Sequence, residues 1–473
     1  MKSTIIKALS LGISAMIWLE SAIAIPEDPS AFDTSQSQDH NVIMRDVCII
    51  GGGSAGTFAA IRLRQMNQSV VVVEREDHLG GHVNTYNDMT TGTAIDYGVL
   101  YYEDLPLVRD YFGHFGIPLE RVSAQKQTAN SRRVDLRTGT SVGPVEGNMA
   151  LALAVYTTQL LRYPYLNTGF NLPNPVPPDL LLPFGEFVKK YKLDGAVDII
   201  ALFNQGVGDL LQQTTLYMMK YFGLDVLQGA LTEFLQPVSH NNSELYVAAQ
   251  DELGKDALLS SAIISTRREE EGKWVKVRVS TPSGEKLIRA RRLIVAIPPK
   301  LDMLQGIDLD PIERGLFEQF NNTCYYTALV KIPGLPQGLQ VVNRANDTAY
   351  NLPPLPAVYV LNPTRSPNLT TILYGSKEHM SENEIKEHMT QSVLSLRNQG
   401  LPVEAPEFVR YSNHSPFLLT VPPEAIANGF YRNLNGLQGN RNTYWMSATF
   451  NAHDSAQIWL FADRLLRSIS QSE

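Results

Sequence analysis

Cysteine is scarce in this sequence of 473 residues, which contains only Cys48 and Cys324. Two cysteines cannot build a four-cysteine zinc or iron–sulfur site, and the nine histidines show no metal-ligand spacing. We therefore predict that the protein has no metal centre. Whether the two cysteines form a disulfide is left open, because that depends on a distance that the sequence does not give.

Positive charge is also in deficit. The chain has 40 Lys and Arg against 48 Asp and Glu, so its formal net charge is −8, and it has no basic cluster. This balance argues against a nucleic-acid partner and against a substrate recognised mainly as a polyanion. With 44% hydrophobic and 19% charged residues, the composition is that of an ordinary globular protein.

Long apolar runs are absent except near the N-terminus. Lys2 and Lys7 precede an apolar run at residues 8–19, and Ala22-Ile23-Ala24 then supplies a small-x-small cleavage pattern. The run is short for a bilayer span, so we predict a signal peptide at residues 1–24, with an uncleaved anchor as the alternative. A flexible leader over residues 25–44, entry into the secretory pathway, secretion and no stable membrane span after cleavage are the expectations that follow.

Secretion is compatible with six N-x-S/T sequons, which are candidates for N-glycosylation. Their asparagines are Asn67, Asn241, Asn321, Asn346, Asn368 and Asn413.

The most informative stretch is a glycine-rich turn between two β-branched runs at residues 47–50 and 69–73. The turn continues into a helix-compatible segment at residues 57–65, so the pattern predicts a strand–helix–strand unit of the dinucleotide-binding type. Its expected cofactor-binding residues are Gly51, Gly53, Ser54, Ala55 and Gly56.

Each glycine of this turn has a physical role. Gly51 permits the tight turn, Gly53 allows the backbone to approach a diphosphate, and Gly56 allows close helix–strand packing. Free N–H groups and the positive end of the helix dipole favour phosphate there. Glu74 lies at the end of the second strand, where a carboxylate can accept hydrogen bonds from ribose hydroxyls.

The residues after Glu74 indicate which dinucleotide is bound. Glu74-Arg75 is followed by Leu79-Gly80-Gly81-His82-Val83-Asn84-Thr85 and then by Ala94-Ile95-Asp96-Tyr97-Gly98-Val99. This order resembles the FAD-dependent amine oxidase-like superfamily, whose signature is E-R, a gap, G-G-R-x-x-T and a D-x-G box. The segments GGGSAGT and GGHVNTY are most similar to those of the fungal beta-cyclopiazonate dehydrogenase family. The resemblance adds Arg75, Gly80, Gly81, His82, Gly98 and Val99 to the cofactor-binding set, with His82 in place of the usual arginine.

The same resemblance implies roles for later residues. Ile263 matches the family's adenine-holding strand residue, and Lys331 matches a lysine that bonds a water near flavin N5; a solvated lysine at a strand end is the alternative. Ser447, Ala448 and Ser455 fall where relatives place a strand and a helix N-terminus against the flavin. Because nothing resembles the cysteine that carries covalent flavin in some relatives, we expect non-covalent FAD.

The fold class expected from these motifs is α/β. A Rossmann-like FAD-binding domain of the three-layer ββα type would be interleaved with an α+β substrate-binding domain. The FAD-binding segments are predicted at residues 45–100, 241–301 and 439–473, and the substrate-domain segments at 101–240, which is largely helical, and 302–438. We also predict a hairpin within residues 121–140 and a helix over 251–259.

The predicted function is FAD-dependent two-electron oxidation of an apolar small molecule, with molecular oxygen or another acceptor reoxidising the flavin. The resemblance implies fungal-type secondary-metabolite biosynthesis and a dehydrogenation, with oxidative cyclisation as one form of it. The alternatives are a secreted flavin amine oxidase that produces hydrogen peroxide, an inactive flavin-fold carrier and an NAD-dependent dehydrogenase.

Overall fold

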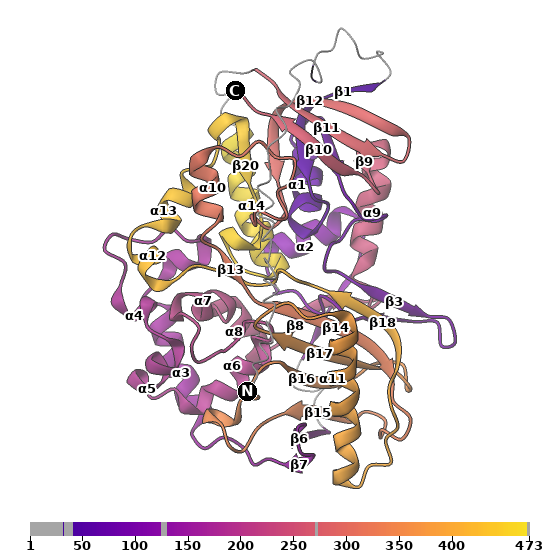
Figure 1. The fold of residues 1–473 in the computed structure, drawn as a ribbon, viewed down its shortest axis with the longest axis vertical. Coiled ribbons are helices and arrows are strands. Elements are labelled where there is room, and N and C mark those ends of the chain that lie inside the picture. The colour runs from indigo at the N-terminus through magenta and orange to yellow at the C-terminus, as the bar shows by residue number, and fades with distance from the viewer. Residues whose placement is uncertain (1–31, 33–40, 124–129, 270–272, 471–473) are drawn as a thin grey trace, which may run out of the picture.

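The computed structural model describes residue 32 and residues 41–123, 130–269 and 273–470. The predicted signal peptide and most of the predicted leader lie outside these residues. Figure 1 shows two sheets, with the strands β1 and β12 of the first at one end of the molecule and β6, β15 and β16 of the second towards the other.

The first sheet has the strand order β10-β11-β12-β1-β2-β9, and β20 also pairs with β12. β1 runs parallel to both β2 and β12, while β11 runs antiparallel to both β10 and β12. Its strands are β1 (Val42–Ile50), β2 (Val70–Val73), β9 (Ala257–Leu258), β10 (Ala262–Arg267), β11 (Val275–Thr281), β12 (Gly284–Val295) and β20 (Thr443–Trp445).

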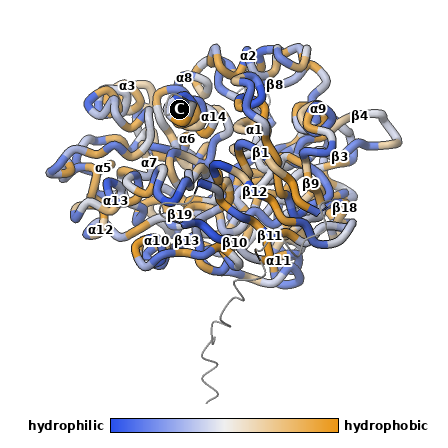
Figure 2. Tube along the Cα trace, turned by 90° about the horizontal axis from the view of Figure 1, so that it is seen from above, coloured by the Kyte–Doolittle hydropathy of each residue, from blue (hydrophilic) through white to orange (hydrophobic). Residues whose placement is uncertain are grey.

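Alternation along β1 decides what lies on each face of this sheet, because successive side chains of a strand point in opposite directions. Val47 and Ile49 pack against a helical layer, while Cys48 and Ile50 join the core on the opposite face. The helices of that layer are α1 (Ser54–Gln65), α2 (Pro106–His114), α9 (Ser243–Leu253) and α14 (Ser455–Ser470). In Figure 2, hydrophobic stretches run along β1 and β12 beside α1.

The second sheet has the order β18-β14-β17-β16-β15-β6-β7. One face packs against α11 (Glu382–Ser395), with Ile385, Met389 and Val393 in the shared core. Its strands are β6 (Ser131–Asp135), β7 (Thr140–Ser141), β14 (Cys324–Lys331), β15 (Gln340–Asn343), β16 (Ala357–Pro363), β17 (Thr370–Ser376) and β18 (Glu407–Asn413).

Helices from one continuous stretch of chain form a helical insert next to this sheet (Figure 1). They are α3 (Met149–Leu160), α4 (Pro178–Leu181), α5 (Phe184–Tyr191), α6 (Val197–Phe203), α7 (Thr215–Tyr221) and α8 (Leu224–Leu231). The other elements are β3 (Thr85–Asp88), β4 (Thr93–Asp96), β5 (Leu119–Val122), β8 (Phe234–Pro237), α10 (Pro311–Phe317), β13 (Asn321–Asn322), β19 (Leu419–Thr420), α12 (Pro423–Ala427) and α13 (Phe430–Asn435). The predicted α/β fold class is confirmed.

Two local predictions were wrong. Residues 251–259 are not one helix: α9 ends at Leu253, and Ala257–Leu258 forms β9 beside β2. β5 does not belong to the predicted hairpin, because it pairs with the distant strand β8. In the described part of this range, which leaves out residues 124–129, β6 and β7 form a hairpin. Both errors reflect tertiary pairing that local sequence patterns do not contain.

No helix in the described part of the chain is long and apolar enough to span a membrane.

A buried ion network joins the first sheet to α10. The side chain of Arg268, the first residue after β10, is fully buried and binds Asp308 at 2.8 Å and the equally buried Glu313 at 2.8 Å. Glu313 also completes the capping box of α10 with Asp310. Arg441 approaches Asp308 from the segment before β20, so three parts of the chain meet in this network.

Removing Arg268 would leave the carboxylate of Glu313 buried without its main partner. We expect Arg268→Leu to lower the free energy of unfolding by about 3–5 kcal/mol. The matched control is Arg278→Leu, which removes an ion pair with the exposed Glu285 and should cost at most about 1 kcal/mol. Urea unfolding of both variants measures the difference, and equal losses would contradict a stabilising role for the buried network.

Candidate functional site

The glycines in the turn between β1 and α1 have two different roles, one in packing and one in leaving space for a ligand. A Cβ atom on Gly56 would lie 1.9 Å from the Gly51 carbonyl oxygen, so Gly56 is required for packing, and Gly51 has a φ of +97°. A Cβ atom on Gly53 would meet only the Gly81 Cα, at 3.8 Å. Gly53 is therefore not required by the protein's own packing, and its missing side chain leaves space beside the helix N-terminus.

Two helix N-termini meet beside Gly53. The Ser54 hydroxyl, at the start of α1, donates to the Ser455 hydroxyl, at the start of α14, over 3.1 Å. Trp459 Nε1 of α14 donates to the Ser54 carbonyl at 3.2 Å, and its ring stacks on Phe58 of α1. Ala55, in the first turn of α1, is buried. Because both helix dipoles point their positive ends here, the position favours an anion such as a diphosphate.

The second glycine pair lies directly on the first. Gly80 N donates to the Gly52 carbonyl at 2.9 Å, and a Cβ on Gly81 would lie 3.0 Å from Gly53 Cα. Glu74 closes the turn, since its carboxylate accepts from Gly52 N at 2.6 Å and from Glu76 N at 2.9 Å. Its remaining lone pairs fit the predicted acceptor role toward a ribose.

Some of the other predicted cofactor-binding residues lie near the glycine turn, and one points away from it. Ile263 is the second residue of β10 and lies two residues after Ser261, whose N–H donates to the Glu74 carbonyl at 2.8 Å, so it lies near the predicted ribose position. Gly98 is pressed against the chain at His82, because a Cβ there would lie 2.0 Å from the His82 carbonyl oxygen, and Val99 follows it. Arg75 is exposed and pairs with Glu76, away from the turn.

The segment after β20 fits a polar ligand. The Ser447 side chain is 6% exposed, and its hydroxyl has no hydrogen-bond partner in the described chain. Ala448 follows it at the start of a short 3-10 turn that leads to α14. An unsatisfied buried hydroxyl is costly, so Ser447 fits a ligand that supplies the missing partner.

Lys331 is not brought to this site. It ends β14 at the exposed side of the second sheet and pairs with Glu407 at 3.1 Å. The opposite end of β14 faces the site, because the Tyr325 carbonyl accepts from His414 N at 2.9 Å. Six residues of extended strand separate the two ends by about 20 Å. The placement gives no support to the predicted role at flavin N5 and fits the alternative of a solvated lysine.

Sequence reasoning missed a cluster of three histidines from three segments. The rings of His82 and His414 stack with centroids 4.4 Å apart, and His453 lies just before α14. His82 is open to solvent, yet the surrounding protein desolvates it enough to lower its pKa to about 4. Burial lowers the pKa of His414 well below its usual value and that of His453 to about 3. All three imidazoles are therefore neutral at pH 7.

Asn84 and two aromatic residues hold this cluster. Asn84 Nδ2 donates to His414 Nε2 at 3.3 Å, which leaves the proton of the neutral ring on Nδ1. The Tyr325 ring lies 5.8 Å from that of His414, and the Phe417 ring lies 4.5 Å from that of His453. No spacing in the sequence joins residues 82, 414 and 453. In the described residues no group of three potential ligands could hold a metal ion.

A pair of carboxyl groups stands next to His453. Glu103 is 2% exposed, and its carboxyl oxygens have no hydrogen-bond partner in the described chain. The neighbouring Asp454 caps α14 by accepting from Gln457 N at 2.9 Å. Burial raises the pKa of Glu103 well above its usual range and also raises the pKa of Asp454. Because the charge of each carboxylate disfavours ionisation of the other, the pair holds a proton at neutral pH.

The helical insert is tied to the same segment by Lys220 of α7. Its ammonium donates to the Leu166 carbonyl and to Asn451 Oδ1, and Asn451 Nδ2 donates to the Gln457 carbonyl of α14 at 2.7 Å. Lys220 is 7% exposed, and burial lowers its pKa to about 7.

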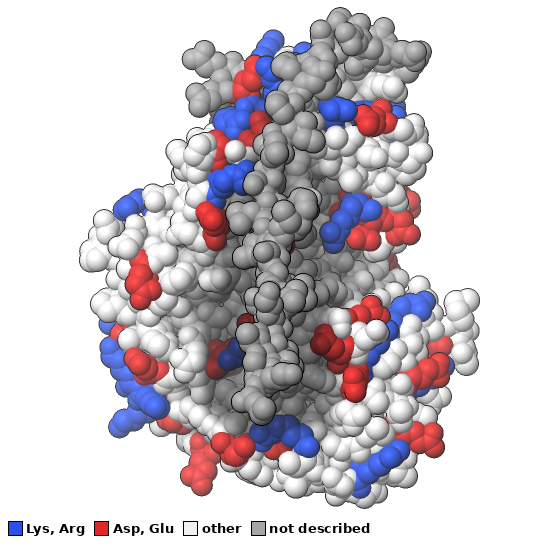
Figure 3. Space-filling model, viewed as in Figure 1, with Lys and Arg blue, Asp and Glu red and all other residues white. Residues whose placement is uncertain are grey.

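The surface shows no strongly charged face in the view of Figure 3, where acidic and basic side chains are interspersed. Of the six sequon asparagines, five are exposed; Asn241 is half-buried, and its side chain accepts from Ser243 N. The exposed ones are Asn67, Asn321, Asn346, Asn368 and Asn413.

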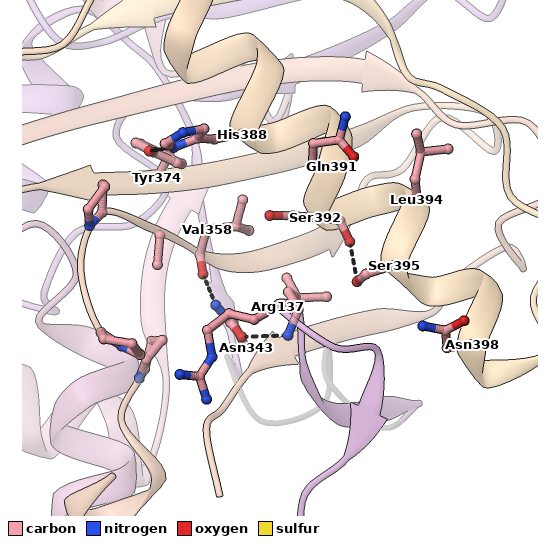
Figure 4. A pocket seen from close by; sticks show the side chains of 15 residues that line it. Arg137, Asn343, Val358, Tyr374, His388, Gln391, Ser392, Leu394, Ser395 and Asn398 are labelled. Carbon is pink, nitrogen blue, oxygen red and sulfur yellow. Dashed lines mark hydrogen bonds between the residues drawn. The ribbon is translucent and has the colours of Figure 1, made fainter. Parts of the chain in front are cut away.

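Two cavities lie away from the glycine turn. One, of about 520 Å³, lies between α11 and the second sheet, with Arg137, Tyr374 and His388 among its lining residues (Figure 4). Its polar groups are largely satisfied within the protein, since Asn343 bonds both Leu136 N and the Val358 carbonyl. The other, of about 250 Å³, lies between the helical insert and the second sheet.

Comparison with known proteins identifies the family. A family model described as an NAD(P)-binding Rossmann-like domain matches residues 49–115. The FAD-dependent oxidoreductase oblC of Cochliobolus heterostrophus is 37% identical over 460 residues, covering 94% of this chain and 95% of the relative. Beta-cyclopiazonate dehydrogenase of Aspergillus oryzae is 34% identical over 467 residues and 98% of each chain.

The chain belongs to this family of fungal FAD-dependent oxidoreductases.

Solved structures agree with the fold. A CLA-producing fatty acid isomerase from P. acnes has a TM-score of 0.73 at 19% identity, covering 90% of this chain and 98% of that one. A triple mutant of putrescine oxidase has a TM-score of 0.66 at 15% identity, covering 91% and 100%. The oxidoreductase therefore has the amine oxidase-like flavoprotein fold, and FAD is its cofactor.

The two glycines give a test of the FAD position. We expect Gly53→Val to keep the fold of the oxidoreductase but to lose FAD, because the new side chain would fill space that a diphosphate needs. Gly56→Ala should instead prevent stable folding, since its Cβ would collide with the Gly51 carbonyl. The ratio of flavin to protein absorbance and the thermal melting curve measure both effects. Full flavin content in Gly53→Val would contradict this placement.

Lys220 gives a pH test of stability. Its folded pKa of about 7 lies below the unfolded value of about 10.4, so between these values unfolding takes up a proton and stability rises with pH. We expect part of the stability gained by the wild type between pH 7 and pH 9 to be missing in Lys220→Met. Urea unfolding at both pH values measures it, and an equal gain in both proteins would contradict the shift.

Proposed function

We propose that the protein catalyses the two-electron oxidation of an apolar small molecule in fungal-type secondary-metabolite biosynthesis, as a dehydrogenation that can lead to ring closure. The observation that carries this proposal is the convergence of α1 and α14 on Gly53, next to a cluster of neutral imidazoles. The similarity to a protein named beta-cyclopiazonate dehydrogenase supports dehydrogenation as the reaction type.

The residues around the glycine turn have different proposed roles in binding FAD, according to their position. The N-termini of α1 and α14, with Gly53, Ser54 and Ser455, would hold the diphosphate of FAD, and Glu74 would bind the ribose. Bound FAD supplies the acceptor for a hydride. The N-terminus of α14 also favours negative charge, which stabilises an anion held against it.

The proton that leaves with the hydride needs an acceptor in the protein. His82 and His453 are neutral at pH 7, and neither lies fully buried, so each offers an unprotonated ring nitrogen to a bound substrate. The lowered pKa makes both rings weak bases in the free protein, so either would accept the proton only as the hydride leaves. His414 is buried behind His82 and is committed to Asn84, so it orients the pair and does not exchange protons directly.

We further propose that FAD is held without a covalent bond and that the protein enters the secretory pathway. Cys48 is fully buried within β1, and Cys324 packs into the core beneath α11, so neither thiol faces the glycine turn. The secretory route rests on the N-terminal pattern and on the exposure of five sequon asparagines.

Purified protein should be yellow, and acid precipitation should leave the colour in the supernatant. Colour retained in the pellet would contradict non-covalent binding and would direct attention to the imidazoles. An extract from a strain lacking the gene, which accumulates the substrate, should bleach the flavin under anaerobic conditions. Flavin that stays oxidised with every such extract would favour the inactive carrier, while hydrogen peroxide formed only with amines would favour the amine oxidase.

A further inference from the structure

The smaller cavity carries an inference about the ligand. It has a volume of about 250 Å³ and lies between the C-terminal end of α6, the loop after it, and β15 and β16 of the second sheet. Apolar wall residues include Ala201, Leu202, Leu211 and Val342. Charged side chains also line it, but they are paired within the protein, Arg344 with Asp198 and Lys377 with Asp209. An engineered apolar cavity of about 150 Å³ takes up benzene, so this one has room for two fused rings.

Asn204 contributes an unsatisfied acceptor to this cavity. The residue is 3% exposed, and its Nδ2 donates to the Ile200 carbonyl at 2.7 Å, which fixes the orientation of the side-chain amide. Its Oδ1 has no hydrogen-bond donor in the described chain. A buried amide oxygen without a donor is costly, and a ligand that brings an O–H or N–H group removes that cost.

The cavity is separated from the histidine cluster by one layer of loop. Tyr359 lines the cavity and hydrogen-bonds the backbone of Gly206. On its other side Gly206 lies against Phe417 and Tyr325, since a Cβ there would be 2.7 Å and 3.1 Å from their rings. Those two rings contact His453 and His414. A group bound in the cavity is therefore close to the site, but it is not at the reacting position.

We propose that this cavity binds an apolar, ring-sized ligand group that carries one hydrogen-bond donor, and that this group is the end of the substrate distant from the flavin. The second half of the proposal rests on the proposed function. The first half does not, because occupation of the cavity requires no turnover.

The experiment uses the full, flavin-loaded protein with 2-naphthol and 2-methoxynaphthalene, which differ in the O–H donor, and measures binding by titration calorimetry. Wild type should bind 2-naphthol about fivefold more tightly than its methyl ether. Asn204→Ala should bind both equally, and Ala201→Trp, which fills the cavity, should bind neither. The matched control is Ser392→Trp, which fills the cavity beneath α11 and should behave as wild type.

Equal affinity of wild type for the two probes, or an unchanged preference in Asn204→Ala, would overturn the proposal. Binding that persists in Ala201→Trp would also overturn it, since the ligand would then lie elsewhere. Melting curves of each variant show that it is folded. Flavin content and flavin bleaching by the extract, measured on the same preparations, report separately on the proposed function, so the two ideas can fail independently.

Discussion

The structure depends on the contact between the first turns of α1 and α14. These helices begin about 400 residues apart in the chain, yet the Ser54 and Ser455 hydroxyls lie 3.1 Å apart, and Phe58 stacks on Trp459 beneath them. Two positive helix ends pressed together repel each other, so an anion between them is stabilising for both. The two helix ends therefore favour binding of a diphosphate, independently of any contact to the base or the sugar of the cofactor.

The histidines and carboxyl groups near these helix ends also affect the charge of the site. Desolvation keeps the three imidazoles neutral, and mutual repulsion of charge keeps a proton on the Glu103–Asp454 pair, so these groups add little net charge to the site. A site with little charge suits an apolar substrate, because few charged groups need to lose water when it binds. The cavity beside α6 offers such a substrate apolar wall residues together with the unpaired amide oxygen of Asn204.

The sequence could predict features that depend on residues close together in the chain, but not features that depend on distant residues. Gly51, Gly53 and Gly56 act within one turn, so their spacing alone indicated the strand–helix unit. His414 and Glu103 escaped notice because their partners, His82 and Asp454, lie hundreds of residues away. The family resemblance implies a role for Lys331 near flavin N5, but the direction of β14 carries its last residue away from the glycine turn. A sequence pattern indicates the succession of strands along the chain, but it does not show which end of a strand faces the site.

The interleaving of the chain has a consequence for assembly. β12 is completed by β1 on one side and by β20 on the other, and α14 contributes the last residues of the site. During synthesis β20 and α14 leave the ribosome long after β1 and α1, so a growing chain has an incomplete groove until both have emerged. We therefore expect FAD to be captured only after α14 has been synthesised.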